Sequence, residues 1–142
     1  MTEHPDESPG FLLWHVTLRW QRDVAAALKP LGLTHVQFVL LASTWWLNEH
    51  GRQPSQAALA AHAGTDVKMT SQVIRTLEQK GFVTREVDVA DTRARRLVVT
   101  GAGAVLAPRA IEAVEAVDRA LLEPLTKSGM RAFTAGLRRL RG

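Results

Sequence analysis

One stretch of the chain, residues 81–103 (GFVTREVDVADTRARRLVVTGAG), restricts the possible folds more than any other. Within it, residues 82–87 and 97–100 are rich in β-branched side chains, which fit the pleated surface of a strand. The charged connection between these two runs carries Arg93, Arg95 and Arg96. We therefore predict a two-stranded hairpin with a basic tip, and we call residues 82–100 the wing.

The segment that precedes the wing, residues 54–81, predicts a helix-turn-helix. Its sequence, PSQAALAAHAGTDVKMTSQVIRTLEQKG, has helical character on both sides of Gly64 and ends at Gly81. Because glycine is typical of helix ends, we expect one helix to begin at Ser55 and a second near Asp66. A helix-turn-helix followed by a basic hairpin is an arrangement that grips duplex DNA.

Length and composition limit the class of protein. The 142-residue chain is long enough for one cored domain, or for a small domain with extra helices. Its net charge of +4 fits a polyanionic partner but decides little alone, and the absence of cysteine excludes disulfides and thiolate metal sites. No apolar run approaches the roughly 20 residues that cross a bilayer, and the acidic start MTEHPDESPG is unlike a signal peptide. We therefore expect a cytoplasmic protein with no membrane partner.

Helix signals also flank the central segment on both sides. Ser8 starts a predicted helix that ends near Leu28, and Thr34 opens a capping box for the next helix, which we expect to be almost wholly buried. Thr100 caps a long helix after the wing, and Pro124 separates it from a final helix. Apolar side chains recur at helical spacing along these outer helices: Phe11, Trp14, Leu18 and Leu28, then Leu106, Ile111, Val114, Val117 and Leu121, and finally Met130, Phe133, Leu137 and Leu140.

So much apolar helical surface exceeds what the core of a small winged helix needs. It is most simply buried against a second copy, which predicts a homodimer with two-fold symmetry. Two reading helices would then lie roughly 34 Å apart, and the operator would be an inverted repeat in double-stranded DNA. The predicted fold is mainly α with a small β-hairpin wing. Its layout is a disordered tail (1–9), helical dimerisation regions (10–30 and 104–142) and a winged helix-turn-helix DNA-binding region (31–103).

The second helix of the helix-turn-helix has two faces by its periodicity. The inward face carries Thr70, Val73, Ile74 and Leu77, and the outward face carries Lys68, Met69, Ser71, Gln72 and Arg75. Glutamine suits adenine edges and arginine suits guanine edges, while lysine and serine more often hold phosphates. Ser55 and Gln56 are further candidates for phosphate contacts, although a helix cap also explains Ser55. The alternative for the outward face is a merely solvated surface.

The chain resembles the MarR family of transcriptional regulators over nearly its whole length. The resembling segments are LGLTHVQFVLL, ALAAHAGTDVKMTSQVIRTLEQKGFVTRE and DVADTRARRLVVTGAG, of which the last is the most specific. The resemblance implies a dimeric winged-helix protein, usually a repressor, that releases DNA when a small phenolic or apolar-anionic ligand binds between the dimer helices and the reader. The chain departs from the family at Gly101-Ala102-Gly103, where a Glu-Lys-Gly-like run is common, and the lost acid weakens the helix cap.

The wing tip matches the family's Asp-x-Arg pattern at Asp91-Thr92-Arg93. The resemblance implies that Arg93 enters the minor groove, where narrow geometry concentrates negative potential, while Asp91 holds its guanidinium. We expect Arg95 and Arg96 to contact phosphates or to form ion pairs at the strand base. The alternative is a solvent-exposed loop that contacts no DNA.

Aromatic residues on the first two helices could wall a pocket for a small aromatic or phenolic effector. They are Trp14, His15, Trp20, Trp45 and Trp46. Packing in the core or the dimer interface is the main alternative for most of them. Arg19, one turn from His15, would supply a partner for an anion. We take His15, Arg19 and Trp45 as candidate ligand contacts.

Catalytic and cofactor motifs are missing from the sequence. The histidines lie on different segments without metalloprotease spacing, and there is no Gly-rich phosphate loop or nucleophile elbow. We expect no enzyme activity, no metal and no cofactor, although a histidine–carboxylate site assembled by folding stays open. A further alternative is a winged-helix protein-interaction module without DNA binding. Such a module should have lost Lys68, Arg75 and Arg93, and all three are present.

Overall fold

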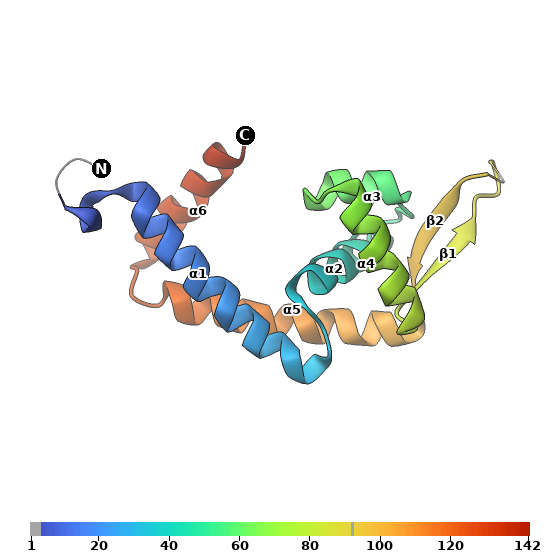
Figure 1. Cartoon of the computed structure of the whole chain (residues 1–142), viewed down its shortest axis with the longest axis horizontal. Coiled ribbons are helices and arrows are strands. Elements are labelled where there is room, and N and C mark those ends of the chain that lie inside the picture. The colour runs from blue at the N-terminus through green and yellow to red at the C-terminus, as the bar shows by residue number, and fades with distance from the viewer. Residues whose placement is uncertain (1–3, 92) are drawn as a thin grey trace.

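The computed structural model describes residues 4–91 and 93–142. Thr92, part of the Asp-x-Arg pattern, lies outside the described residues, as do residues 1–3. The elements in chain order are η1 (Pro5–Glu7), α1 (Pro9–Leu28), η2 (Lys29–Leu31), α2 (His35–Glu49), α3 (Gln56–Ala63), α4 (Val67–Gln79), β1 (Val83–Val87), β2 (Arg95–Val99), α5 (Gly101–Leu122) and α6 (Lys127–Arg141). The mainly helical fold with one hairpin is the predicted class (Figure 1).

The predicted helix starts are confirmed by their caps. The Ser8 hydroxyl accepts a hydrogen bond from the Phe11 N–H at 3.3 Å. Thr34 has both hydrogen bonds of a capping box with Gln37. Thr100 Oγ1 accepts from the Gly103 N–H at 3.0 Å. Each cap satisfies an amide that would otherwise lack a partner in the first turn of its helix.

The N-terminal segment is more ordered than the predicted disordered tail. Pro5–Glu7 form a 3-10 turn, and the His4 ring accepts a hydrogen bond from the Asp6 N–H at 3.1 Å. Helix α1 begins at Pro9, because Ser8 caps it and proline suits the first helical position. Residues 1–3 of the predicted tail lie outside the described residues.

The wing is a two-stranded antiparallel hairpin, as predicted. Val83 pairs with Val99 and Arg85 with Leu97, and the side chains of Val83 and Leu97 are buried. The Leu97 N–H also donates to the Pro54 carbonyl at 2.9 Å, which fastens β2 to the segment before α3. The hairpin is thus anchored to the body of the protein through β2.

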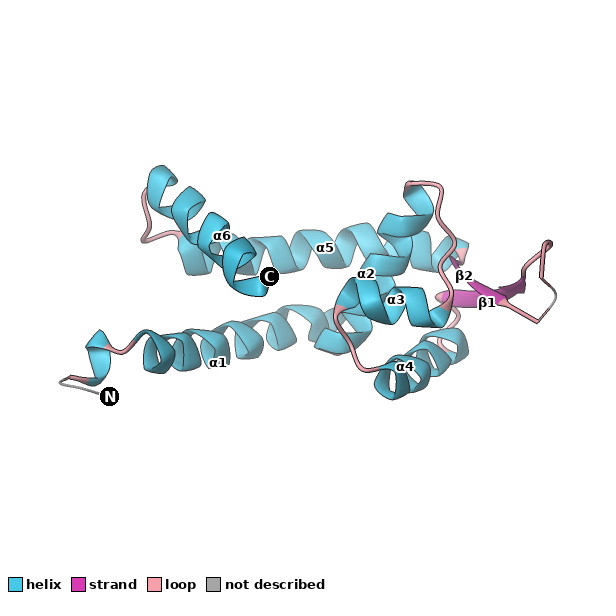
Figure 2. Ribbon diagram, turned by 90° about the horizontal axis from the view of Figure 1, so that it is seen from above, coloured by secondary structure: helices cyan, strands magenta, loops and turns pink. Residues whose placement is uncertain are grey.

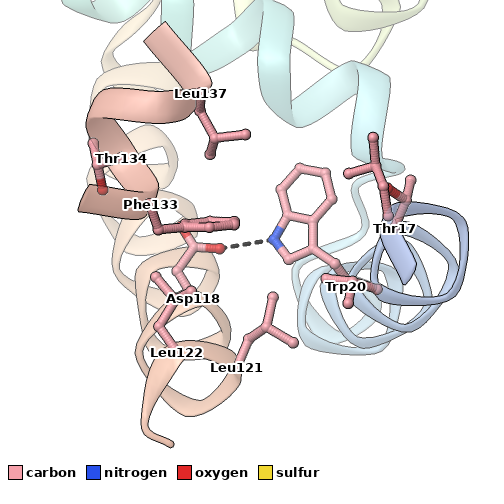
Figure 3. Close-up of a pocket in the computed structure, with 10 residues that line it drawn as sticks. Thr17, Trp20, Asp118, Leu121, Leu122, Phe133, Thr134 and Leu137 are labelled. Carbon is pink, nitrogen blue, oxygen red and sulfur yellow. Dashed lines mark hydrogen bonds between the residues drawn. The ribbon is translucent and has the colours of Figure 1, made fainter. Parts of the chain in front are cut away.

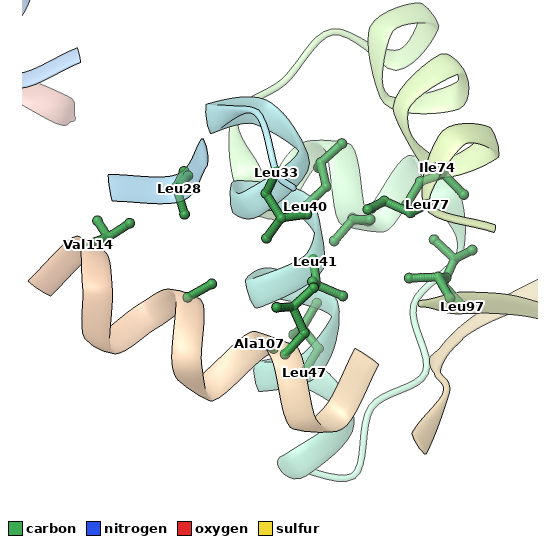
Figure 4. Packing of buried hydrophobic residues seen from close by; sticks show 14 of the residues in the cluster. Leu28, Leu33, Leu40, Leu41, Leu47, Ile74, Leu77, Leu97, Ala107 and Val114 are labelled. Carbon is green, nitrogen blue, oxygen red and sulfur yellow. The ribbon is translucent and has the colours of Figure 1, made fainter. Parts of the chain in front are cut away.

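The hydrophobic core is centred on α2, which packs against α4, α3, β2 and α5 (Figure 4). Its fully buried side chains include Leu28, Leu40, Leu41, Leu59, Ile74, Leu77 and Leu97. The prediction that this helix is almost wholly buried was wrong, because only Leu40, Leu41, Thr44 and Leu47 are buried. The largest departure is Trp46, which is 45% exposed. The reason is an open hollow between α2, α3 and α5, lined by Ala42, Ser43, Trp46, His62 and Ile111.

The long helices α1 and α5 pack together and carry α6 at the end of the molecule opposite the wing (Figures 1 and 2). None of the residues of α6 is buried. Within residues 4–91 and 93–142, no single helix is long and apolar enough to span a membrane. Only a pair, Pro9–Leu31 with His35–Glu49, meets that length and composition together, and the two are bent by 71°.

Candidate nucleic-acid interface

Helix α4 presents the two faces that its sequence predicts. Asp66 caps the helix by accepting from the Met69 N–H at 3.2 Å. The inward residues Thr70, Ile74 and Leu77 are fully buried, and Val73 is partly buried against the same core. On the outward face, Lys68, Met69, Gln72 and Arg75 are exposed and Ser71 is half-buried. The exposed set combines a cation near the helix start with amide and guanidinium groups one and two turns later.

The turn between α3 and α4 is fixed by local hydrogen bonds. Gly64 adopts a left-handed conformation with φ of 72°, which ends α3. The hydroxyls of Thr65 and Thr70 lie 2.7 Å apart, and Thr70 Oγ1 also donates to the Asp66 carbonyl at 2.8 Å. These contacts fix the turn to the start of α4, and the Thr65 N–H donates to the Ala60 carbonyl at 3.0 Å, which ties the turn to α3.

At the start of α3, the two candidate residues are placed differently. Ser55 caps the helix by accepting from the Ala58 N–H at 3.1 Å, so the capping role that the sequence allowed is present. Gln56 is half-buried, and its Oε1 is buried with no hydrogen-bond partner among the described residues. Its amide is therefore turned partly into the protein.

Two aspartates shape the wing tip. Asp88 Oδ1 accepts from the Ala90 N–H at 2.8 Å, and Asp91 Oδ1 accepts from the Arg93 N–H at 3.1 Å. Asparagine and aspartate make such turns because their short side chains reach the amide two residues on. The contact seen for Asp91 is thus with the backbone of Arg93 rather than with its guanidinium. The Arg93 residue itself is exposed.

Arg95 and Arg96, which follow the tip, differ from each other. Arg96 Nε donates to Asp88 Oδ2 at 2.7 Å, and its Nη1 donates to the Gln53 carbonyl at 3.3 Å. Of the two roles that the sequence allowed for Arg96, the ion pair is the one seen here. The Ala90 N–H and the Arg96 guanidinium hold the pKa of Asp88 below its usual value. Arg95 is exposed.

Two side chains outside the predicted site, those of Asn48 and Arg85, tie together the elements around the helix-turn-helix and the wing, which we call the reader. The Asn48 amide donates to the carbonyls of Arg52 and Leu97 and accepts from the Val99 N–H, so one side chain joins α2 to β2. Arg85 Nε lies 2.8 Å from Glu78 Oε1, which joins β1 to α4. Asn48 and its partners in β2 are far apart in the sequence, and Arg85 and Glu78 lie on either side of a turn. No local sequence pattern predicts either contact.

Among the described residues, no hydrogen bond, ion pair or ring contact joins the three candidate ligand contacts to one another. His15 is exposed and packs edge-on against Phe11, with ring centroids 4.5 Å apart. Arg19 Nε lies 3.7 Å from Asp23 Oδ2. Trp45 is half-buried and packs against the core. Within the described ranges, no group of three or more histidine and carboxylate side chains could hold a metal ion.

A cleft of about 390 Å³ opens between α1, α5 and α6 (Figure 3). Its wall is mostly apolar, from Leu13, Val16, Thr17, Trp20, Asp118, Leu121, Leu122, Phe133, Thr134 and Leu137. The Trp20 indole N–H donates to Asp118 Oδ1 at 2.8 Å, and the same ring meets His35 edge-on at 5.0 Å. Burial lowers the pKa of His35, with Asp118 acting in the opposite direction.

Exposed apolar side chains gather on α1 and α6, two of the three helices that border this cleft. On α1 they are Leu12, Leu13, Trp14, Val16 and Leu18, and on α6 they are Met130, Phe133, Leu137 and Leu140. Monomeric proteins rarely leave so many large apolar side chains together in water. The outer helices therefore have the surface that the predicted dimer requires.

Comparison with known proteins gives consistent matches. The MarR family model matches residues 33–94. The chain is 42% identical over 136 residues to the uncharacterized HTH-type transcriptional regulator YdcH of Bacillus subtilis, covering 96% of this chain and 91% of that protein. It is also similar to two crystal structures of the MarR family protein Rv2887 of Mycobacterium tuberculosis. The complex with DNA has 34% identity, a TM-score of 0.75 and coverage of 96% and 100%. The complex with salicylic acid has 36% identity, a TM-score of 0.73 and coverage of 96% and 99%.

Proposed function

Because this chain belongs to the MarR family of transcriptional regulators, we propose that it binds duplex DNA as a homodimer and represses transcription from an inverted-repeat operator. Repression is proposed because the similar Rv2887 is named a transcriptional repressor. Each protomer would insert α4, the recognition helix, into the major groove and the wing tip into the adjacent minor groove.

The observation that carries this proposal is that α4 has one buried face and one exposed polar face. One face is buried in the core through Thr70, Ile74 and Leu77, while the opposite face leaves Gln72 and Arg75 exposed. An exposed glutamine and arginine on one helix face can read adenine and guanine edges. Lys68, Met69 and Ser71 complete the proposed contact surface of this helix.

The wing is proposed to add contacts that depend less on sequence. Arg93 is exposed at a tip whose shape is held by Asp88 and Asp91, so its guanidinium is free to enter a narrow minor groove. Arg95 is exposed beside it and would contact phosphate. Ser55 and Gln56, at the start of α3, remain proposed phosphate contacts through the helix N-terminus.

We also propose that an aromatic effector controls DNA binding. The similar Rv2887 has been crystallised with salicylic acid and with p-aminosalicylic acid. In this chain His15, Arg19 and Trp45 remain the proposed contacts. No contact joins them within the described part of the protomer, and in this proposal the second copy completes their site. Tryptophan fluorescence that stays unchanged with a panel of aromatic acids would argue against such a site.

A gel shift with the DNA upstream of the protein's own gene, at two salt concentrations, tests the DNA-binding proposal. We expect a dimer-sized complex that weakens steeply at the higher salt, because bound phosphates release counterions. Sedimentation of the free protein should show a dimer. A monomer, or a protein that ignores DNA in dilute buffer, would leave a protein-interaction module as the better explanation.

A further inference from the structure

Lys80 makes a contact that joins two distant parts of the chain. It follows the last turn of the recognition helix, and its ammonium donates to the Gly32 carbonyl at 2.6 Å and to Gln37 Oε1 at 3.2 Å. Both acceptors belong to the junction between α1 and α2, 48 and 43 residues away. The contact therefore ties the end of α4 to the segment that links α2 to α1, where the predicted dimerisation region ends at residue 30.

Both acceptors are also held in place by contacts that do not involve Lys80. Gly32 ends the η2 turn in a left-handed conformation with φ of 71°. Gln37 Oε1 already accepts from the Thr34 N–H at 3.1 Å in the capping box. A charged donor between two fixed acceptors has a defined position, and hydrogen bonds from an ammonium group are stronger than neutral ones.

The junction is itself tied to the outer helices. His35, the first residue of α2, meets the Trp20 ring of α1, and Trp20 donates to Asp118 of α5. The end of α4 is thus joined to both long helices of the proposed dimer region through the Lys80 contacts, the backbone of residues 32–37, and the contacts of His35 and Trp20. The orientation of α4 relative to those helices determines the distance between the two recognition helices of a dimer.

We propose that Lys80 is a positioning residue for DNA binding. It fixes the C-terminal end of α4 against the α1–α2 junction, and so sets the spacing of the two recognition helices, without contacting DNA itself. This inference rests on the proposed function. The two lysines of this region would then have different roles. Lys80 positions α4, whereas Lys68, exposed in the first turn of α4, is a proposed phosphate contact.

The test compares Lys80→Met with Lys68→Met, and with Lys29→Met as a control. Lys29 is also exposed and lies beside the same α1–α2 junction, so the control removes the same charge there. Affinity for the protein's own palindromic operator is measured by fluorescence anisotropy at several salt concentrations. The series is repeated on operators whose half-sites are one base pair closer or farther apart.

Lys80→Met is expected to weaken binding about tenfold per dimer, the loss expected for two charge-assisted contacts. Its salt slope should equal that of the parent, and its preference for the natural half-site spacing should shrink. Lys68→Met should instead lower the salt slope by about one unit per subunit and keep the spacing preference. Lys29→Met should behave like the parent.

Three results would overturn the inference. A salt slope that falls in Lys80→Met would make this lysine a phosphate contact. An unchanged affinity would show that the contact is dispensable. A lower melting temperature with an unchanged spacing preference would reduce Lys80 to a stabilising residue. If the parent protein itself ignores the operator, the proposed function fails instead, and the two failures are thereby separated.

Discussion

Arg96 and Asp88 form an ion pair within the wing, with Arg96 Nε 2.7 Å from Asp88 Oδ2. The same guanidinium reaches the Gln53 carbonyl before α3, so Arg96 joins the wing to the body of the protein. A side chain with two internal partners is less available to phosphate than the exposed Arg93.

Replacing Arg96 by glutamine should loosen the wing without removing a phosphate contact. Amide hydrogen exchange within residues 83–99 should become faster, because β2 loses a side-chain tie at its outer end. The salt slope of DNA binding should stay that of the parent. A slope that falls by about one unit per subunit would identify Arg96 as a phosphate contact after all.

Low pH should destabilise the wing, because the Asp88 carboxylate becomes protonated. The pKa of Asp88 lies below 3.8 in the folded protein because the Ala90 N–H and Arg96 favour the carboxylate. The stabilisation is therefore complete above the ordinary carboxyl pKa and is lost as pH falls through the lower, folded value. An NMR titration of the side-chain carboxyl carbon should show this low midpoint, and Arg96→Gln should raise it. Equal midpoints in the two proteins would contradict the assignment.

His35 should make the fold sensitive to mildly acidic conditions. Burial lowers its pKa below 6.5, so the unfolded chain takes up a proton more readily than the folded protein does. Stability should be full above pH 6.5 and decline as pH falls toward the lower folded value. Melting temperatures measured between pH 7.5 and 5.5 should fall less for His35→Gln than for the parent. Parallel curves for the two proteins would argue against this role.

Gly103 should tolerate no side chain. A Cβ at this position would lie 2.1 Å from the Phe82 carbonyl oxygen, so α5 and the start of the wing would have to move apart. Gly103→Ala is expected to destabilise the protein by about 1–3 kcal/mol in denaturant unfolding. Gly101→Ala, with nothing within 4 Å of the new Cβ, is the matched control. It should be neutral or more stable by up to about 1 kcal/mol.

Arg93→Ala should weaken binding to many DNA sequences by a similar amount, on the order of 1–3 kcal/mol, if the wing tip enters the minor groove as proposed. The fold should be unaffected, because the residue is exposed and Asp91 contacts its backbone N–H. Anisotropy titrations on the operator and on an unrelated duplex measure both effects. Parental affinity on both DNAs would remove Arg93 from the interface.

Much of the fold follows from short-range signals. The caps at Ser8, Thr34 and Thr100 and the glycine that ends α3 each depend on neighbours within a few residues, and each lies where the sequence predicts it. The two faces of α4 follow from helical periodicity for the same reason. Which outward residues contact DNA remains a prediction, because their roles depend on a partner molecule.

The contacts that orient these elements could not be predicted in the same way. Lys80 and Gly32 are 48 residues apart, Asn48 and Val99 are 51 apart, and Trp20 and Asp118 are 98 apart. Folding brings each pair together, and nothing in either local sequence indicates the other member. The exposure of Trp46 depends likewise on how α3 and α5 diverge around α2.

The exposed apolar side chains of α1 and α6 have a consequence for stability. A single subunit leaves Trp14 61% and Leu140 83% exposed, so folding and association are linked equilibria. The melting temperature should therefore rise with protein concentration, and dilution alone should make the regulator easier to unfold.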